Sequence, residues 1–147
     1  MADSTLRLRF FGDAHGFGEL LAEASAKPFA GQGSAYLQIA DIQEFADQIA
    51  KYPLTSGEPI SISGRYFSSG EPNLSIQVYP ISLRGYVGVR VHLASEINQG
   101  QHLTAQNKAS IEIVTTYEPL KRFSDNLKAL VHGQVAEIVL NGESFRE

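Results

Sequence analysis

The chain has 147 residues and a formal net charge of −4; 43% of its residues are hydrophobic and 19% are charged. This composition is typical of a globular protein, and the length predicts that residues 1–147 form a single domain. The absence of cysteine excludes disulfides, thiolate zinc sites, iron–sulfur clusters and a cysteine nucleophile, and it is consistent with a cytoplasmic location. The mild acidity argues against nucleic-acid binding, which needs clustered basic side chains.

Neither a membrane span nor a signal peptide is expected from the sequence. No apolar stretch approaches the roughly 18 residues that are needed to cross a bilayer. Near the N-terminus, leucine and arginine alternate, whereas a signal peptide would show a continuous apolar run followed by small residues.

The first elements of the chain are predicted to be strands. Residues 6–10 alternate apolar side chains with arginines, which is the period of a half-buried strand. Residues 19–26 fit a strand or a helix by period, and the glycine-rich turns and Pro28 around them favour a strand. Residues 35–39 predict a third strand.

A helix is predicted to begin at Asp41, whose carboxylate would accept from amides of the first turn, with Glu44 completing a capping-box spacing. Pro53 would end this helix, and a strand is predicted over residues 60–64. The apolar face of the helix has the spacing i, i+3, i+4, i+7, i+8 and comprises Ile42, Phe45, Ala46, Ile49 and Ala50.

The second half of the chain predicts the same kinds of element in the same order. Strands are expected over residues 74–78, 87–93 and 110–113, and residues 87–93 give the strongest alternation. In that strand the valines should point to the core, so Arg90 and His92 should point to the other face. A helix is then expected near Pro119 with Gly133 after its end, followed by a strand over residues 135–140.

These similarities indicate an internal repeat with halves of about residues 1–73 and 74–147. The segment beginning at Phe45 aligns without gaps with the segment beginning at Phe123 over about twenty residues, and upstream the alignment needs four extra residues before the second helix. Two unrelated amphipathic helices with flanking strands would also look alike. The sequence therefore predicts an α+β fold, with a mainly antiparallel sheet, two helices and a strand–strand–strand–helix–strand pseudo-repeat.

No constellation of residues predicts catalysis, a cofactor or a metal ion. The four histidines lack the spacing of a helical metal site. Asp13 and His15 share a glycine-rich loop, but no nucleophile motif accompanies them, so a polar turn is the simpler interpretation. We therefore expect a protein that is not an enzyme, with no cofactor.

Charge and aromatic content favour a surface that binds a protein. Residues 1–73 hold nine acidic and five basic side chains, which suggests an acidic face for a basic partner. Aromatic residues are dense near the middle of the chain, and exposed tyrosines are typical of interfaces. These residues are Tyr66, Phe67, Tyr79, Tyr86 and Tyr117. The candidate partner-binding residues are Glu19, Glu23, Tyr86, Arg90 and His92.

Four segments together resemble small bacterial proteins, including uncharacterised domains and the WapI-type immunity proteins of polymorphic-toxin systems. The segments are AYLQIADIQEFADQI at 35–49, LSIQV at 74–78, GYVGVRVHL at 85–93 and ASIEI with LKRFSDNL within 109–127. The resemblance implies a cytoplasmic protein that binds and blocks a toxin domain, and it identifies no site residues. The sequence leaves two alternatives open: a small-ligand binder or enzyme with a cleft between the halves, and a homo-oligomeric accessory protein.

Overall fold

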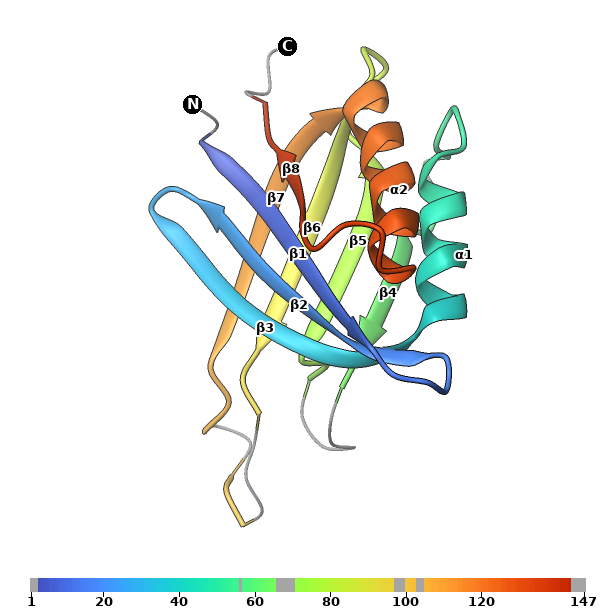
Figure 1. Cartoon of the computed structure of the whole chain (residues 1–147). Helices are drawn as coiled ribbons and strands as arrows, with labels where there is room; N and C mark the ends of the chain where they lie inside the picture. The colour runs from blue at the N-terminus through green and yellow to red at the C-terminus, as the bar shows by residue number, and fades with distance from the viewer. Residues whose placement is uncertain (1–2, 56, 66–70, 97–99, 103–104, 144–147) are drawn as a thin grey trace.

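The computed structural model of the chain describes residues 3–55, 57–65, 71–96, 100–102 and 105–143, which form eight strands and two helices (Figure 1). The elements of the first half are β1 (Ser4–Gly12), β2 (Phe17–Ala26), β3 (Phe29–Gln38), α1 (Ile39–Ile49) and β4 (Ile60–Gly64). Those of the second half are β5 (Leu74–Pro80), β6 (Tyr86–Ala94), β7 (Lys108–Thr116), α2 (Tyr117–Val131) and β8 (Ile138–Asn141).

The strands form two antiparallel sheets, which confirms the predicted α+β class. Sheet A has the strand order β3-β2-β1-β8, and sheet B has the order β4-β5-β6-β7. The last strand of each half pairs with the first strand of the other half, β4 with β5 and β8 with β1. Each sheet therefore contains strands from both halves of the chain.

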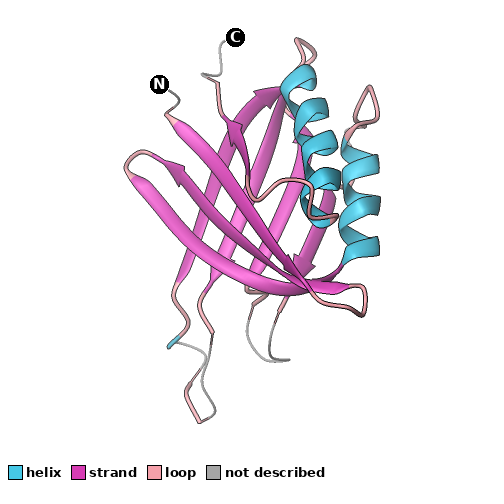
Figure 2. Cartoon of the chain, in the orientation of Figure 1, coloured by secondary structure: helices cyan, strands magenta, loops and turns pink. Residues whose placement is uncertain are grey.

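The two sheets pack face to face, with their strands crossing at an angle, and the helices lie side by side along one flank (Figures 1 and 2). The sheets contact each other mainly through β3, β6 and β7, while α1 lies against β4 and α2 against β8. One apolar core collects the inward side chains of both sheets and of both helices. Burial of this apolar surface, drawn from both halves, is the main favourable term in folding.

The halves correspond in element order, and the strand orders of the two sheets correspond when the halves are exchanged. The helices begin at Ile39 and Tyr117, each six residues before the matched Phe45 and Phe123. In both halves the third strand runs directly into the helix, so the proposed insertion of four residues before the second helix is wrong. Descent from one duplicated segment stays a prediction.

The predicted alternation along β6 is confirmed, as is the strand over residues 19–26. Val87, Val89 and Val91 are 0% exposed, whereas Arg90 and His92 lie on the other side of the sheet and are partly exposed. A strand with one face in the core must alternate in this way, because its side chains point to opposite faces in turn.

The predicted start of the first helix is wrong, for a tertiary reason. Helix α1 begins at Ile39, so Asp41 lies inside the helix and not at its cap position, and the cap residue Gln38 makes no side-chain cap. The amide of Ile39 instead donates to the carbonyl oxygen of Gly16 at 2.8 Å. The β1–β2 turn therefore supplies the acceptor for an amide of the first helical turn. Asp41 lies in the first turn of α1, where the helix dipole favours a carboxylate.

The second helix agrees better with its prediction than the strand that follows. Pro119 lies in the first turn of α2, and Gly133 follows its end with a φ of +73°. The last strand begins at Ile138 instead of Val135, because its pairing with β1 extends only as far as Ile138 opposite Leu8. Among the described residues, neither helix is long and apolar enough to span a membrane.

Candidate functional site

The structure divides the candidate partner-binding residues between two surfaces. Glu19 and Glu23 point outward from β2 in sheet A, and Tyr86, Arg90 and His92 point outward from β6 in sheet B. Since the sheets pack through their inner faces, the two outer faces point away from each other. We call them the A face and the B face, and the five residues do not form a single site.

The A face carries cross-strand rows of side chains over β1, β2 and β3, and three neighbouring rows hold its exposed rings and charges. Neighbours in such a row have Cβ atoms about 4.5–5.5 Å apart and can contact a ligand together. These three rows, from one end of the sheet toward the other, are Phe11–Glu19–Tyr36, Arg9–Leu21–Ser34 and Arg7–Glu23–Gln32.

Aromatic rings are exposed at the first of these rows. Phe11 is 59% exposed and Tyr36 is 46% exposed. The ring of Phe17 stacks on that of Tyr36, with 5.9 Å between centroids and an interplanar angle of 8°. Large exposed rings gathered on one sheet face are characteristic of surfaces that bind other molecules.

A turn beside this row holds Tyr36 in place. The Tyr36 hydroxyl donates to Asp13 Oδ2, and Asp13 Oδ1 accepts from the amides of His15 at 2.7 Å and Phe17 at 3.2 Å. These bonds lower the pKa of Asp13, chiefly through Tyr36, and the same carboxylate raises the pKa of Tyr36. Asp13 and His15 therefore form the polar turn that was the simpler interpretation of their loop.

The charges of the A face are mixed. Arg7 and Glu137 approach to 3.7 Å, as do Arg9 and Glu23, and Val139 lies opposite Arg7 with 38% of its surface exposed. The acidic excess of the first half is thus not gathered on one sheet face, because other carboxylates lie on α1, where Lys128 pairs with Asp47 at 2.5 Å.

Two open grooves run over the A face. One has a volume of about 460 Å³ and the other about 160 Å³, and Arg7, Glu23 and Gln32 line both. A concave, partly charged surface with exposed rings at one end offers both apolar contact and charge to a partner.

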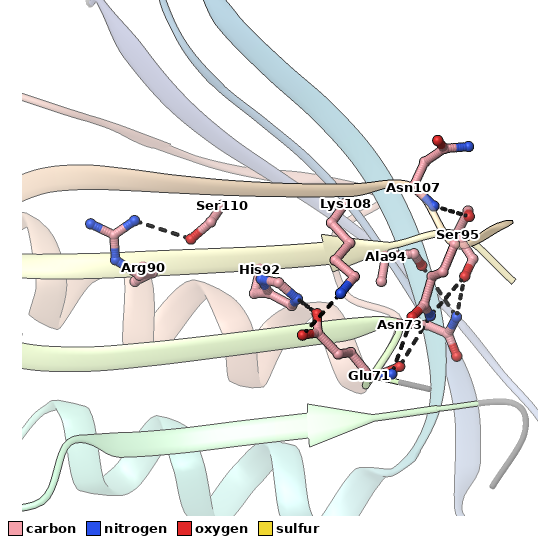
Figure 3. A network of polar contacts seen from close by, with 10 residues as sticks. Glu71, Asn73, Arg90, His92, Ala94, Ser95, Asn107, Lys108 and Ser110 are labelled. Atoms are coloured by element: carbon pink, nitrogen blue, oxygen red, sulfur yellow. Dashed lines mark hydrogen bonds and ion pairs between the residues drawn. The ribbon is translucent and has the colours of Figure 1, made fainter. Parts of the chain in front are cut away.

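The B face instead carries polar side chains that bond to one another. Glu71 Oε2 lies 2.7 Å from Nε2 of His92, and Glu71 Oε1 lies 3.2 Å from Nζ of Lys108 (Figure 3). These two partners, His92 first, lower the pKa of Glu71.

A second group of contacts continues along the B face. Arg90 lies 3.7 Å from Glu112 and donates to the Ser110 hydroxyl at 3.1 Å. Tyr79 donates its hydroxyl to Glu112, and its ring covers Gly88, where a Cβ would come within 2.4 Å of it. Burial, and next the Glu112 carboxylate, raise the pKa of Tyr79 to about 12.

Buried amide side chains anchor the end of this network near Glu71 (Figure 3). Asn73, 4% exposed, donates from Nδ2 to the carbonyl oxygens of Ala94 at 3.2 Å and Ser95 at 3.3 Å. Gln106 accepts from the Glu71 amide and donates to its carbonyl oxygen. The loops are thereby tied to the sheet beneath a groove of about 350 Å³ that Glu71, Arg90 and His92 help to line.

Tyr86 lies apart from Arg90 and His92. It opens β6, opposite Thr116, six residues before His92. At about 3.3 Å per residue the two residues are roughly 20 Å apart. Two further tyrosines of the predicted aromatic cluster, Tyr79 and Tyr117, make internal contacts, and Tyr66 and Phe67 lie outside the described residues.

Metal ligands do not gather in the described part of the chain, where no group of three or more histidine and acidic side chains is placed to hold an ion. The residues that sequence reasoning missed are Phe11 and Tyr36 on the A face and Glu71 on the B face. Phe11 has the parity of Arg7 and Arg9, and Tyr36 lies between the inward Ala35 and Leu37, so alternation predicts both as outward. Glu71 precedes its strand and gives no such signal.

Compared with models of known protein families, the chain gives no match, and a search of curated proteins likewise finds none.

Proposed function

We propose that the protein binds a protein partner through the A face and catalyses no reaction. The observation that carries this proposal is the exposure of Phe11, Phe17 and Tyr36 at one end of an open sheet face. Exposed aromatic rings combine large apolar area with low conformational entropy, which is why they dominate the energetics of interfaces.

The difference between the faces supports this choice. Arg90, His92 and Lys108 on the B face already contact carboxylates of the same face, so a partner would have to break those contacts. The rings of the A face expose apolar surface to water, and covering that surface is favourable by about 25 cal/mol per Å².

We propose further that the protein is a cytoplasmic bacterial immunity protein and that its partner is a basic toxin domain. Support comes from the resemblance of residues 35–49, 74–78, 85–93 and 109–127 to WapI-type immunity proteins, and from the net charge of −4. Opposite net charges speed association and help to exclude wrong partners.

The experiment is to co-express the chain with the toxin-like domain encoded beside its gene, measuring growth rescue in cells and affinity by calorimetry. We expect rescue by the wild type and at least about tenfold weaker binding by Phe11→Ser, as for an interface hot spot. Gln77→Ser, at an exposed position of the B face, is the matched control and should bind as the wild type does.

Two results would contradict the proposal. If no toxin-like domain is encoded nearby and none binds, the immunity function is wrong. If Gln77→Ser weakens binding and Phe11→Ser does not, the partner uses the B face. Light scattering on the free protein separates a self-associating accessory protein from a monomer that binds another chain.

A second candidate function, action on a small ligand at the B-face groove, is favoured by one observation. The Glu71–His92 pair lies beside Ser75 and Ser110, which flank His92 on the neighbouring strands. A carboxylate that orients an imidazole next to a hydroxyl is the arrangement of nucleophilic hydrolases. Ester hydrolysis by the wild type that His92→Gln abolishes would establish this function; equal rates in both proteins would remove it.

A further inference from the structure

The row Phe11–Glu19–Tyr36 places a carboxylate between two aromatic side chains. Phe11 pairs with Glu19 across β1 and β2, and Glu19 pairs with Tyr36 across β2 and β3. All three side chains point outward from sheet A, since the inward positions of these strands are taken by core residues such as Leu8 and Leu20. The three side chains therefore form one continuous surface.

The tyrosine of this row is held before any partner arrives. Phe17 stacks on one face of the Tyr36 ring, and the Tyr36 hydroxyl is bonded to Asp13, yet the residue keeps 46% of its surface exposed. Fixing a ring in advance removes the entropy cost of ordering it during binding.

The carboxylate of this row accepts a hydrogen bond from a neighbouring strand. The hydroxyl of Ser34 donates to Glu19 Oε2 at 3.4 Å, and an ionised carboxylate offers about four acceptor positions. Asp13, bonded to the same tyrosine, adds a second negative charge beside the row. On the neighbouring rows the arginines are directed to other carboxylates, Arg9 to Glu23 and Arg7 to Glu137.

The chemistry of this surface selects one kind of ligand group. Aromatic faces attract cations, and a carboxylate pairs with them at the same time. A guanidinium is planar, stacks on rings, donates two parallel hydrogen bonds to a carboxylate and loses water more easily than an ammonium. An arginine side chain therefore fits this surface better than a lysine, and an acidic or purely apolar side chain does not match its charge.

We propose that Phe11, Glu19 and Tyr36 form the subsite that receives an arginine side chain of the protein partner. This inference rests on the proposed function of the A face and names the group of the partner that is recognised there. It predicts that the bound segment of the partner is basic at the point where it meets the first row of sheet A.

The test uses the full chain and a defined probe, the blocked peptide Ac-Gly-Arg-Gly-NH₂, titrated into ¹⁵N-labelled protein. We expect saturable amide shifts at Phe11, Glu19 and Tyr36, and about fivefold weaker binding to Glu19→Gln, the loss that corresponds to one exposed ion pair. Glu118→Gln, which removes an exposed carboxylate of α2 outside the A face, is the matched control and should bind the peptide as the wild type does. Ac-Gly-Gln-Gly-NH₂ should shift none of these amides.

Each other outcome overturns the subsite. It is wrong if the glutamine peptide gives equal shifts, if Glu19→Gln and Glu118→Gln lose affinity equally, or if the arginine peptide shifts only the B face. It is also wrong if the row's amides shift with protein concentration alone, since the occupant is then a second copy of the chain. A toxin domain that binds the wild type and Glu19→Gln equally would leave the A-face function intact and remove only the arginine subsite.

Discussion

The A face and the B face belong to sheets of the same strand order, but their outward side chains are satisfied in different ways. On the B face, Arg90, His92 and Lys108 contact Glu112 and Glu71 of the same surface. On the A face, rings such as Phe11 lie open to water. Charged side chains are paired on both faces, and the difference is that the A face also leaves large aromatic rings exposed to water.

This difference changes how outward polar residues should be interpreted. Arg90 and His92 point outward as the alternation predicted, but their partners on the protein reduce what they offer to another molecule. A charge that is already paired must lose that partner or share it, and this cost offsets the gain from binding. The direction in which a side chain leaves the sheet therefore marks it as a candidate binding residue, and its contacts within the protein decide whether it is available to a partner.

The largest effect should follow from removing a buried amide at the end of the B-face network. Asn73→Ala removes two buried hydrogen bonds, to the carbonyl oxygens of Ala94 and Ser95, of which Ser95 keeps a bond from Gln106 at 3.0 Å, and we expect a loss of about 2 kcal/mol of unfolding free energy. Urea denaturation measures it. Gln77→Ala, exposed on the same face, should change stability by less than about 0.5 kcal/mol. Equal effects of both variants would show that the network does not stabilise the fold.

The next effect concerns Tyr79, whose hydroxyl is bonded to Glu112. Tyr79→Phe should cost about 1 kcal/mol, because the bond is charge-assisted but only partly buried. The raised pKa means that the folded state holds the phenol proton more tightly than the unfolded state. The contribution of the Tyr79 hydroxyl to the free energy of unfolding is therefore complete below pH 10 and is lost as the pH rises toward about 12.

Absorbance at the tyrosinate band, followed against pH, tests this assignment. The wild type should show one phenol titrating near pH 12 that is missing from Tyr79→Phe. Tyr86→Phe, at the start of β6 on the same face, serves as the control and should keep that late step. If the late step survives in Tyr79→Phe, the Tyr79–Glu112 contact does not form.

Local sequence pattern was sufficient for the faces of the strands. The valines of β6 and the apolar face of α1 follow from period alone, and Gly133 marks the end of α2 because its positive φ favours glycine. Period also placed Arg90 and His92 outward. These features depend on residues within one element, so the sequence of that element determines them.

Features that depend on distant segments escaped prediction. The start of α1 depends on Gly16, which lies in the β1–β2 turn. The prediction that Asp41 caps the helix was wrong for this reason. The separation of Glu19 from His92 depends on which sheet each strand joins, and no periodicity encodes that choice. Glu71 reaches His92 across the sequence, so only the fold shows that the candidate residues form two surfaces.

A smaller effect should appear at acid pH when Glu71 is changed. Its pKa is lowered by His92 and then Lys108, so its contribution to stability is present above the ordinary value of 4.5 and is lost as the pH falls through the lowered pKa. Glu71→Gln should therefore have a lower urea midpoint than the wild type at pH 7 and approach the wild type as the carboxyl becomes protonated. If the difference in urea midpoint does not change with pH, the charge of the Glu71 carboxylate does not stabilise its contacts with His92 and Lys108.

The smallest effect on stability, and the one that separates the faces most directly, is expected for Phe11→Ser. Because Phe11 is 59% exposed, replacing it should alter unfolding free energy by less than about 0.5 kcal/mol. The same change should lower the binding of a hydrophobic dye such as anilinonaphthalene sulfonate to the folded protein, since it removes one ring from the group formed by Phe11, Phe17 and Tyr36, and such dyes bind contiguous apolar patches more than single exposed side chains. Leu83→Ser, which removes an exposed apolar side chain from the β5–β6 turn, is the control and should leave dye binding nearly unchanged. If Phe11→Ser instead destabilises the fold as much as Asn73→Ala does, the A face contributes to the structure in the same way as the B face, and the proposed division between a binding surface and a structural surface fails.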